Sequence, residues 1–257
     1  MTAARLLPLA VFLALLGAWE AVVHLQSIPP YILPAPSLIF TTLIDDWRLL
    51  SASLAVTLRI TALALALATG FGVLFAVLFA QWRWLERSLF PLAVILQVTP
   101  IIAIAPLLLV YLDAGTAVLA CAFLVAFFPI LSNTALGLSS TDHNLRDLFD
   151  LYGASRWQQI KLLRLPSALP YFLGGLRIAG GLSLIGAIAA EIAAGAAGQG
   201  AGLAYRIVEA GYRLNIPRMF AALALISIAG IAIWLALEWA NRAMLSRWHE
   251  SARERGL

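Results

Sequence analysis

The chain has 257 residues, of which 62% are hydrophobic and 12% are charged, and its formal net charge is +4. Soluble domains carry about a quarter charged residues, so this composition excludes an ordinary soluble enzyme or binding module and indicates an integral membrane protein. The one cysteine, Cys121, excludes both an intrachain disulfide and a multi-cysteine metal site.

Six apolar runs are long enough to cross a bilayer as helices, which takes about 20 residues. They cover approximately 6–25, 54–80, 89–112, 116–138, 171–194 and 219–241. The sequence therefore predicts an all-α membrane protein of about six transmembrane helices. We expect an N-terminal anchor helix with an outer connecting segment over 1–53, a core of five spans over 54–245, and a cytoplasmic tail over 246–257.

The first run resembles a signal peptide in that Arg5 precedes an apolar core. That core is about as long as a full span, and Trp19, Glu20 and His24 stand where a cleavage site would need small residues. We therefore expect an uncleaved signal anchor.

The third run contains Pro91, Pro100 and Pro106, and each proline removes one helical hydrogen bond. We expect breaks at Pro100 and at Pro106, and Gln97 and Thr99 place polar groups beside the first of them. Unpaired backbone groups are costly in hydrocarbon, so such breaks usually lie against protein or along a wet path, as in transporters. We predict that these positions, Pro91 excepted, border the translocation path. A kink packed against neighbouring helices is the alternative.

A long polar stretch, residues 141–166, separates the fourth and fifth runs. Leu145, Leu148, Phe149 and Tyr152 recur within it at helical spacing, which predicts a short amphipathic helix. The apolar side of such a helix can lie in a groove of a partner protein. A helix that rests on the membrane surface is the alternative.

Signals for helix ends follow within the same polar stretch. Gly153 can adopt the left-handed conformation that ends a helix, and Ser155 is a candidate N-cap for a second helix. Pro166 is expected to end that second helix close to the next span.

The fifth run is rich in small residues, which permit close helix approach, and it carries Glu191 near its end. An ionisable group inside a span is a candidate for function, so Glu191 is expected either to line an outer gate or to pair with an arginine such as Arg206. The Gly-rich stretch 195–202 follows a membrane helix and not a strand, which favours an outer connection over a dinucleotide fingerprint.

Two other acidic residues stand four positions before a basic or titratable residue. Glu20 precedes His24, and Glu238 precedes Arg242. Residues four apart are neighbours on a helix surface, so we expect Glu238 to form a structural pair with Arg242, and Glu20 either to pair with His24 or to reach the membrane interface.

The basic residues predict the orientation of the chain. With the N-terminus inside, eleven of them fall on the cytoplasmic side, namely Arg5, Arg83, Arg87, Arg146, Arg156, Lys161, Arg164, Arg242, Arg247, Arg253 and Arg255. Four fall on the outer side, namely Arg48, Arg206, Arg213 and Arg218. This asymmetry favours cytoplasmic termini and a cytoplasmic 141–166 stretch.

Lys161 is the only lysine, and the glycines that a P-loop requires do not precede it. No His, Asp and Glu grouping has the spacing of a metal site. We therefore expect no cofactor or metal in this chain. If ATP drives its activity, a partner must hydrolyse it.

The polar stretch closely resembles the EAA loop of ABC importer permeases. Asp147 stands six residues before Gly153, and nine residues separate that glycine from Leu163-Arg164-Leu165-Pro166. The family pattern is Glu-Ala-Ala, then a glycine, then Ile-x-Leu-Pro. This chain departs from it in having Asp147-Leu148-Phe149 in place of Glu-Ala-Ala.

Further motifs resemble the branch of these permeases that serves nitrate, sulfonates, taurine and pyrimidine precursors. They include Ile32-Leu33-Pro34-Ala35-Pro36-Ser37, Thr57-Leu58-Arg59, Thr99-Pro100-Ile101-Ile102, Ala126-Phe127-Phe128-Pro129, Gly175-Leu176-Arg177 and Ala190-Glu191. The resemblance extends from about Trp19 to Trp248.

The resemblance implies a type I ABC importer permease fold in the bacterial inner membrane. It implies a homodimer in contact with membrane lipid, bound to two ATPase subunits that carry ATP and Mg, and supplied by an external solute-binding protein. It implies no catalytic residue and no nucleic-acid partner. The residues that it assigns to ATPase docking are Asp147, Leu148, Phe149, Asp150, Leu151, Tyr152, Gly153, Ala154, Ser155, Arg156, Leu165 and Pro166.

Two other classes of membrane protein are alternatives to this interpretation. A self-contained secondary transporter or channel would commonly show an inverted repeat, and an intramembrane enzyme would need an acid–base or metal constellation. Neither feature is recognisable in the sequence. The sequence does not distinguish among sulfonates, nitrate, taurine and thiamine-precursor pyrimidines as the solute.

Overall fold

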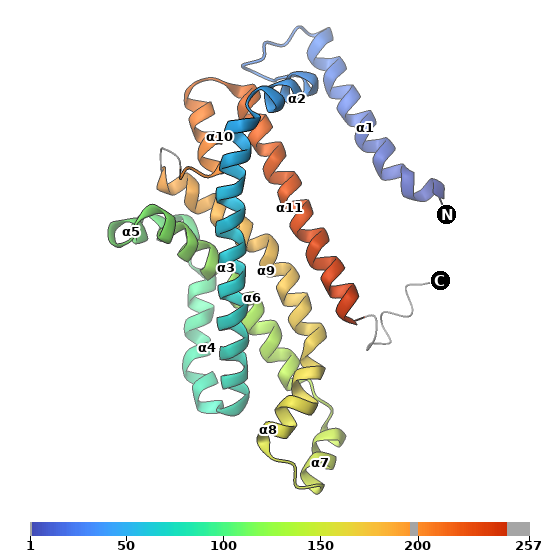
Figure 1. Ribbon diagram of the computed structural model, residues 1–257, viewed down its shortest axis with the longest axis vertical. Helices are drawn as coiled ribbons and strands as arrows, with labels where there is room; N and C mark the ends of the chain where they lie inside the picture. The colour runs from blue at the N-terminus through green and yellow to red at the C-terminus, as the bar shows by residue number, and fades with distance from the viewer. Residues whose placement is uncertain (1, 196–199, 246–257) are drawn as a thin grey trace. The chain divides into compact units, whose positions relative to one another are not determined.

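The computed structural model describes residues 2–195 and 200–245, with side chains from residue 7 onward. The predicted tail 246–257 and positions 196–199 of the Gly-rich stretch lie outside the described residues. The helices are α1 (Thr2–Leu25), α2 (Pro36–Asp45), α3 (Trp47–Gln81), α4 (Arg83–Val98), α5 (Ile101–Tyr111), α6 (Ala114–Ser139), α7 (His143–Leu151), α8 (Arg156–Gln159), the π-helical turn η1 (Ile160–Arg164), α9 (Leu165–Ala194), α10 (Leu203–Tyr212) and α11 (Ile216–Leu245) (Figure 1).

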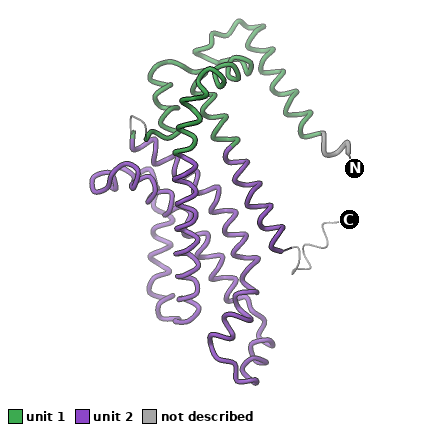
Figure 2. Tube along the Cα trace, in the orientation of Figure 1, with its two compact units in different colours: residues 1–56, 195–228 green, residues 57–194, 229–257 purple. Residues whose placement is uncertain are grey.

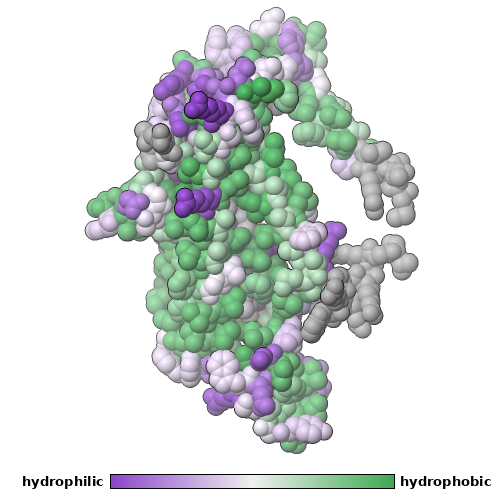
Figure 3. Space-filling model, in the orientation of Figure 1, coloured by the Kyte–Doolittle hydropathy of each residue, from purple (hydrophilic) through white to green (hydrophobic). Residues whose placement is uncertain are grey.

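The all-helical prediction is confirmed for the described part of the chain. Five stretches there are long and apolar enough to cross a membrane, namely Leu7–Leu25, Trp47–Gln81, Ala114–Ser139, Arg156–Ala194 and Ile216–Leu245. The pair α4 and α5 makes a sixth if it is counted as one broken span. The long helices carry an apolar outer surface (Figure 3), as lipid contact requires.

The third apolar run is not the single span that its length predicts, because α4 and α5 meet at an angle of 101°. The break lies at Thr99 and Pro100, as predicted, and both residues have extended backbone conformations. A residue that precedes proline is disfavoured in the helical conformation, and Pro100 itself has no N–H to continue the helix.

The expectation of a second break at Pro106 is wrong. Pro106 lies inside α5, which continues to Tyr111. A proline in a membrane helix removes one hydrogen bond without ending the helix when the neighbouring backbone can adjust. Position 106 therefore follows the break and does not create one.

The described residues form two compact units (Figure 2). One comprises the described parts of 1–56 and 195–228, and the other comprises 57–194 and the described part of 229–257. The sequence-based division at residue 53 assigned 195–228 to the core, whereas the structure groups that segment with the N-terminal part of the chain.

The first unit has a small apolar core of its own. Leu50, Leu203, Ala221 and Leu225 are buried together in it. Arg218 also donates two hydrogen bonds to the carboxylate of Asp46, at 2.6 and 2.8 Å. Such a two-bonded pair fixes geometry as well as charge, so it ties α11 to the end of α2.

The second unit is built on close contact between α6 and α9. An added Cβ at Gly186 would lie 2.9 Å from the Cα of Ala122, and one at Gly175 would lie 2.7 Å from the carbonyl oxygen of Pro129. These glycines therefore let the two backbones approach closely. The small residues of the fifth run are thus used for packing within this chain.

Candidate functional site

The polar stretch 141–166 folds into two short helices at one end of the second unit (Figure 1). The first, α7, is capped by Asp142, whose carboxylate accepts a hydrogen bond from the backbone N–H of Asn144 at 2.8 Å. The predicted amphipathic helix is confirmed. Leu145 and Leu148 on that face are 45% and 44% exposed, and Tyr152 just beyond is 84% exposed. The apolar side of α7 is therefore presented outward.

Gly153 ends α7 in the predicted way. Its φ is +65°, its N–H donates to the carbonyl of Asp150, and the N–H of Ala154 donates to the carbonyl of Phe149. This pair of hydrogen bonds is a Schellman motif, in which the residue after the helix must adopt the left-handed conformation. Glycine is the residue that does so without steric cost.

Ser155 caps α8, as predicted. Its hydroxyl accepts from the N–H of Gln158 at 3.3 Å, while the Gln158 side chain accepts from the N–H of Ser155 at 2.7 Å. This reciprocal capping box fixes the entry into the second helix. The amide of Gln159 also donates to the carboxylate of Asp150 at 2.6 Å, which joins α8 to α7.

The expectation that Pro166 ends the second helix is wrong. Helix α8 passes through η1 into α9 without a break, and Pro166 lies in the first turn of α9. In η1 the N–H of Leu165 donates to the carbonyl of Ile160, five residues earlier. A wider turn of this kind accommodates a proline ring that would clash in a regular α-helix. The loop therefore continues directly into a membrane span.

A shallow hollow of about 370 Å³ lies beside the exposed apolar face of α7. Its lining includes Leu148, Phe149, Tyr152, Gly153 and Leu162. Leu151 and Trp157 are exposed on the same loop, at 85% and 71%. Large apolar side chains gathered on an exposed, structured loop mark an interaction surface.

The other residues assigned to docking are placed as follows. Asp147 and Arg156 are exposed, Ala154 is half-buried beside the Gly153 turn, and Leu165 and Pro166 begin α9. The structure brings 147–156 together as one surface. It places the last two in the adjoining membrane helix.

The residues predicted to border the translocation path occupy two different environments. Gln97, Thr99, Pro100 and Pro106 are exposed around the α4–α5 bend. Glu191 is only 5% exposed and accepts a hydrogen bond from the hydroxyl of Thr57 at 2.8 Å.

The α5 helix is linked to the segment that holds Glu191. Ala105 of α5 and Ala190 of α9 belong to one buried apolar cluster. The segment after the bend therefore packs beside the position of the buried carboxyl.

Sequence reasoning missed Thr57 as a partner of Glu191. Thr57 lies in the Thr57-Leu58-Arg59 motif, and a threonine inside an apolar span is the signal that identifies it. The proposed arginine, Arg206, donates to the hydroxyl of Ser53 at 3.0 Å and to the carboxylate of Glu209 at 2.7 Å. The hydrogen bond from Arg206 holds the pKa of Glu209 below its usual value.

Both predicted structural pairs are confirmed, and each has a further member. Glu238 pairs with Arg242 at 2.9 Å and with Arg177 of α9 at 2.7 Å. The pair of Glu20 and His24 also holds the Ser37 hydroxyl, at 2.6 Å from the Glu20 carboxylate. The extra partners are distant in sequence, so spacing alone did not reveal them.

These features define a multi-pass helical protein with a structured loop joined directly to a span, which is the architecture of a membrane transport subunit. Residues 68–249 match the family described as binding-protein-dependent transport system inner membrane component. The chain belongs to this family and has the type I ABC importer permease fold.

Individual relatives identify the branch of the family to which the chain is most similar in sequence. It is 37% identical over 251 residues to the riboflavin transport system permease protein RibX of Chloroflexus aurantiacus, covering 95% of this chain and 90% of that one. It is 34% identical to the formylaminopyrimidine transport permease protein ThiX of Halalkalibacterium halodurans (93% and 94% covered) and 28% identical to the taurine transport system permease protein TauC of Escherichia coli (91% and 86%). The predicted branch is confirmed.

A solved structure supports the fold independently. The chain resembles a subunit of an amino acid ABC transporter crystallised with histidines, with a TM-score of 0.65 and 17% identity. The match covers 79% of this chain and 98% of the other. The likeness supports the fold and says nothing about the solute.

Proposed function

We propose that this chain is the membrane-spanning subunit of an ATP-driven importer and that the loop 141–166 docks on a separate ATPase. The observation that carries the proposal is the exposed apolar face of α7, held in a fixed conformation by the Gly153 turn and the Asp150–Gln159 hydrogen bond. An amphipathic helix with this exposure suits a groove in a partner protein.

The energy source follows from what this chain lacks. With one lysine and no P-loop sequence around it, the chain cannot bind ATP in the way of a P-loop ATPase. ATP and Mg are therefore assigned to the partner. Two permease copies, homodimeric in the proposed assembly, would engage two ATPase subunits, and an external binding protein would deliver the solute.

The continuity of α8, η1 and α9 suggests how the coupling operates. These elements form one helical stretch, Arg156–Ala194, of 39 residues, which is roughly 58 Å long at 1.5 Å per residue. Its first residues adjoin the docking face, and Glu191 lies near its far end. A displacement of the loop on ATP binding would be carried along this helix, which would favour one of two membrane conformations.

We assign the path to the α4–α5 bend and to the Thr57–Glu191 pair. Gln97, Thr99 and Pro100 are exposed at the bend and, in the proposed dimer, border the path. Pro106 lies between one and two turns further along the helix after the break. Glu191 acts as a gate that its hydrogen bond to Thr57 holds in one position.

The solute class follows from the relatives' names. They refer to riboflavin, a formylaminopyrimidine and taurine, which are small polar or anionic compounds. We propose a solute of this class for the present chain, selected chiefly by the external binding protein.

Co-purification tests the proposal. The chain, expressed with candidate ABC ATPases of its own organism, is expected to retain one of them through affinity capture and to support ATP-dependent uptake with it in proteoliposomes. Uptake that needs only an ion gradient, with no ATPase retained, would instead identify a self-contained secondary transporter or channel.

A further inference from the structure

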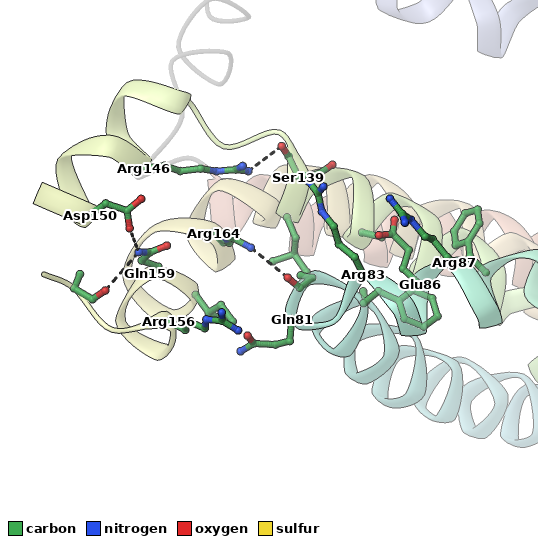
Figure 4. A pocket seen from close by; sticks show the side chains of 18 of the residues that line it. Gln81, Arg83, Glu86, Arg87, Ser139, Arg146, Asp150, Arg156, Gln159 and Arg164 are labelled. Carbon is green, nitrogen blue, oxygen red and sulfur yellow. Dashed lines mark hydrogen bonds between the residues drawn. The ribbon is translucent and has the colours of Figure 1, made fainter.

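A second, larger cavity is lined in part by residues of the same loop. It has a volume of about 970 Å³ and is enclosed by the end of α3, the start of α4, the end of α6 and the loop helices (Figure 4). Its volume is at the upper end of the range for small-molecule sites. The docking proposal does not use it.

The cavity is strongly basic. Five arginines line it, namely Arg83, Arg87, Arg146, Arg156 and Arg164. Two carboxylates, Glu86 and Asp150, stand against them. Five guanidinium groups against two carboxylates leave the lining with an excess of positive charge. An excess of positive charge in one hollow attracts anions.

Two of the arginines are built into the wall. Arg146 donates to the carbonyl of Ser139 at 3.0 Å, and Arg164 donates to the carbonyl of Ala80 at 3.4 Å (Figure 4). The Nε atoms of both are buried without a hydrogen-bond partner among the described residues. Buried donors of this kind normally have a partner, so both guanidinium groups keep unmet hydrogen-bonding capacity beside the cavity.

The other three arginines lie on the rim. Arg83, Arg87 and Arg156 are exposed, and none forms an ion pair with another residue that the structure describes. Guanidinium groups bind phosphate oxygens through paired hydrogen bonds. The rim and the wall together therefore suit a phosphate group.

The opposite wall of the cavity is apolar. Phe79, Phe90 and Leu138 form part of it, and the two rings contact each other with centroids 6.4 Å apart. Trp82 and Trp84, at the α3–α4 turn, are 47% and 66% exposed. Tryptophans concentrate at the depth of the lipid headgroups, so the cavity lies at the membrane–water boundary.

We propose that this cavity binds the phosphate headgroup of an anionic phospholipid, with the arginines on the phosphate and the apolar wall against the first carbons of the acyl chains. Basic pockets between membrane helices take such headgroups. A bound phosphate would join Arg83 and Arg87 of α4 to Arg156 of α8, and so would tie the loop to a neighbouring span. The inference depends on the chain's place in the membrane and is independent of ATPase docking.

The test measures lipid binding to the full-length chain in detergent by native mass spectrometry. Phosphatidylglycerol and cardiolipin are each compared with phosphatidylcholine. The wild-type chain is expected to prefer the anionic lipids. The double variant Arg83→Gln/Arg87→Gln is expected to bind them about 25-fold more weakly, since each basic residue near an anionic surface contributes roughly a fivefold factor.

Two variants serve as controls. Arg83→Lys/Arg87→Lys keeps the charge and is expected to retain most of the preference, which separates the lost charge from misfolding. Arg48→Gln, an exposed arginine at the far end of α3, is expected to leave the preference unchanged. A preference that survives the loss of Arg83 and Arg87 would overturn the proposal.

Two further outcomes would assign the cavity to another ligand. Inorganic phosphate that binds without lipid and displaces the anionic lipids at millimolar concentration would show a site for a free anion. Loss of ATPase retention in the double variant, with lipid preference unchanged, would show that an acidic surface of the ATPase enters the cavity. Either result would contradict the lipid assignment.

Discussion

The Gln159 amide reaches back across the Gly153 turn and donates to the Asp150 carboxylate at 2.6 Å. This contact links the two loop helices through their side chains and, together with the Gly153 turn, holds α7 against α8. We expect Gln159→Ala to leave membrane insertion intact and to reduce ATP-dependent transport several-fold, because a hydrogen bond to a charged group contributes roughly 1.5–3 kcal/mol.

Uptake assays on proteoliposomes with equal amounts of reconstituted protein measure this effect. Gln26→Ala, a change of the same kind beside the end of α1, is the matched control. Normal uptake by Gln159→Ala would show that this contact between the loop helices has no role in coupling.

The left-handed Gly153 predicts a graded series. Alanine at φ +65° costs roughly 1–2 kcal/mol, and proline is excluded by its fixed φ and by the N–H that Asp150 accepts. Gly153→Ala should lower transport partially and Gly153→Pro should abolish it, with both proteins inserted. Gly174→Ala, where an added Cβ meets open space, is the control. Equal activity of the alanine and proline variants would contradict this account of the turn.

How far the sequence reveals the loop can be judged from individual residues. The helix end at Gly153 and the cap at Ser155 were predictable, because both depend on local backbone geometry. Pro166 was misjudged because its effect depends on η1, a local widening that no composition pattern marks. Thr57 and Arg177 were missed as partners because their contacts join segments far apart in the chain.

In the fold, too, features that depend on local sequence were predictable and features that depend on contacts between distant segments were not. Apolar run lengths predicted the spans, and the break at Pro100 followed from proline chemistry. The angle of 101° between α4 and α5 could not be predicted in this way. It depends on packing among residues far apart in the chain, such as Ala105, Val118 and Ala190.

The close contact of α6 and α9 predicts strong sensitivity to added volume. Gly186→Val would place methyl groups against Ala122 and should destabilise the folded chain by about 1–3 kcal/mol, or more if the helices cannot separate. The thermal midpoint in detergent should fall by several degrees. Gly181→Val is the control, since an added Cβ there meets no atom within 4 Å. Matching midpoints for the two variants would argue against this packing.

The path assignment predicts a contrast in cysteine reactivity. In a Cys121→Ala background, Gln97→Cys and Thr99→Cys should react quickly with small aqueous thiol reagents, because both positions are exposed at the bend. Glu191→Cys should react slowly in the resting state, because the position is buried. Its rate should change when ATP is trapped. Rates that are slow at all three positions and insensitive to nucleotide would indicate packing and no path.

The orientation predicts labelling from one side only. Ser140→Cys, just before the loop, should resist an impermeant thiol reagent applied to intact cells and react once the membrane is opened. Arg213→Cys, on the predicted outer side, should react in intact cells. Labelling of Ser140→Cys from outside would reverse the topology and separate the loop from any cytoplasmic ATPase.

The most direct test of the central claim measures ATPase retention by variants of the α7 face. Leu148→Asp and Tyr152→Asp place a charge on positions that are 44% and 84% exposed and lie outside the buried core, so the chain should still insert and fold. Tyr212→Asp, on α10 and exposed to about the same extent as Tyr152, is the matched control. We predict that both loop variants lose the co-purifying ATPase and ATP-dependent uptake while Tyr212→Asp keeps both. Full ATPase retention by Leu148→Asp and Tyr152→Asp would contradict the docking role of the loop.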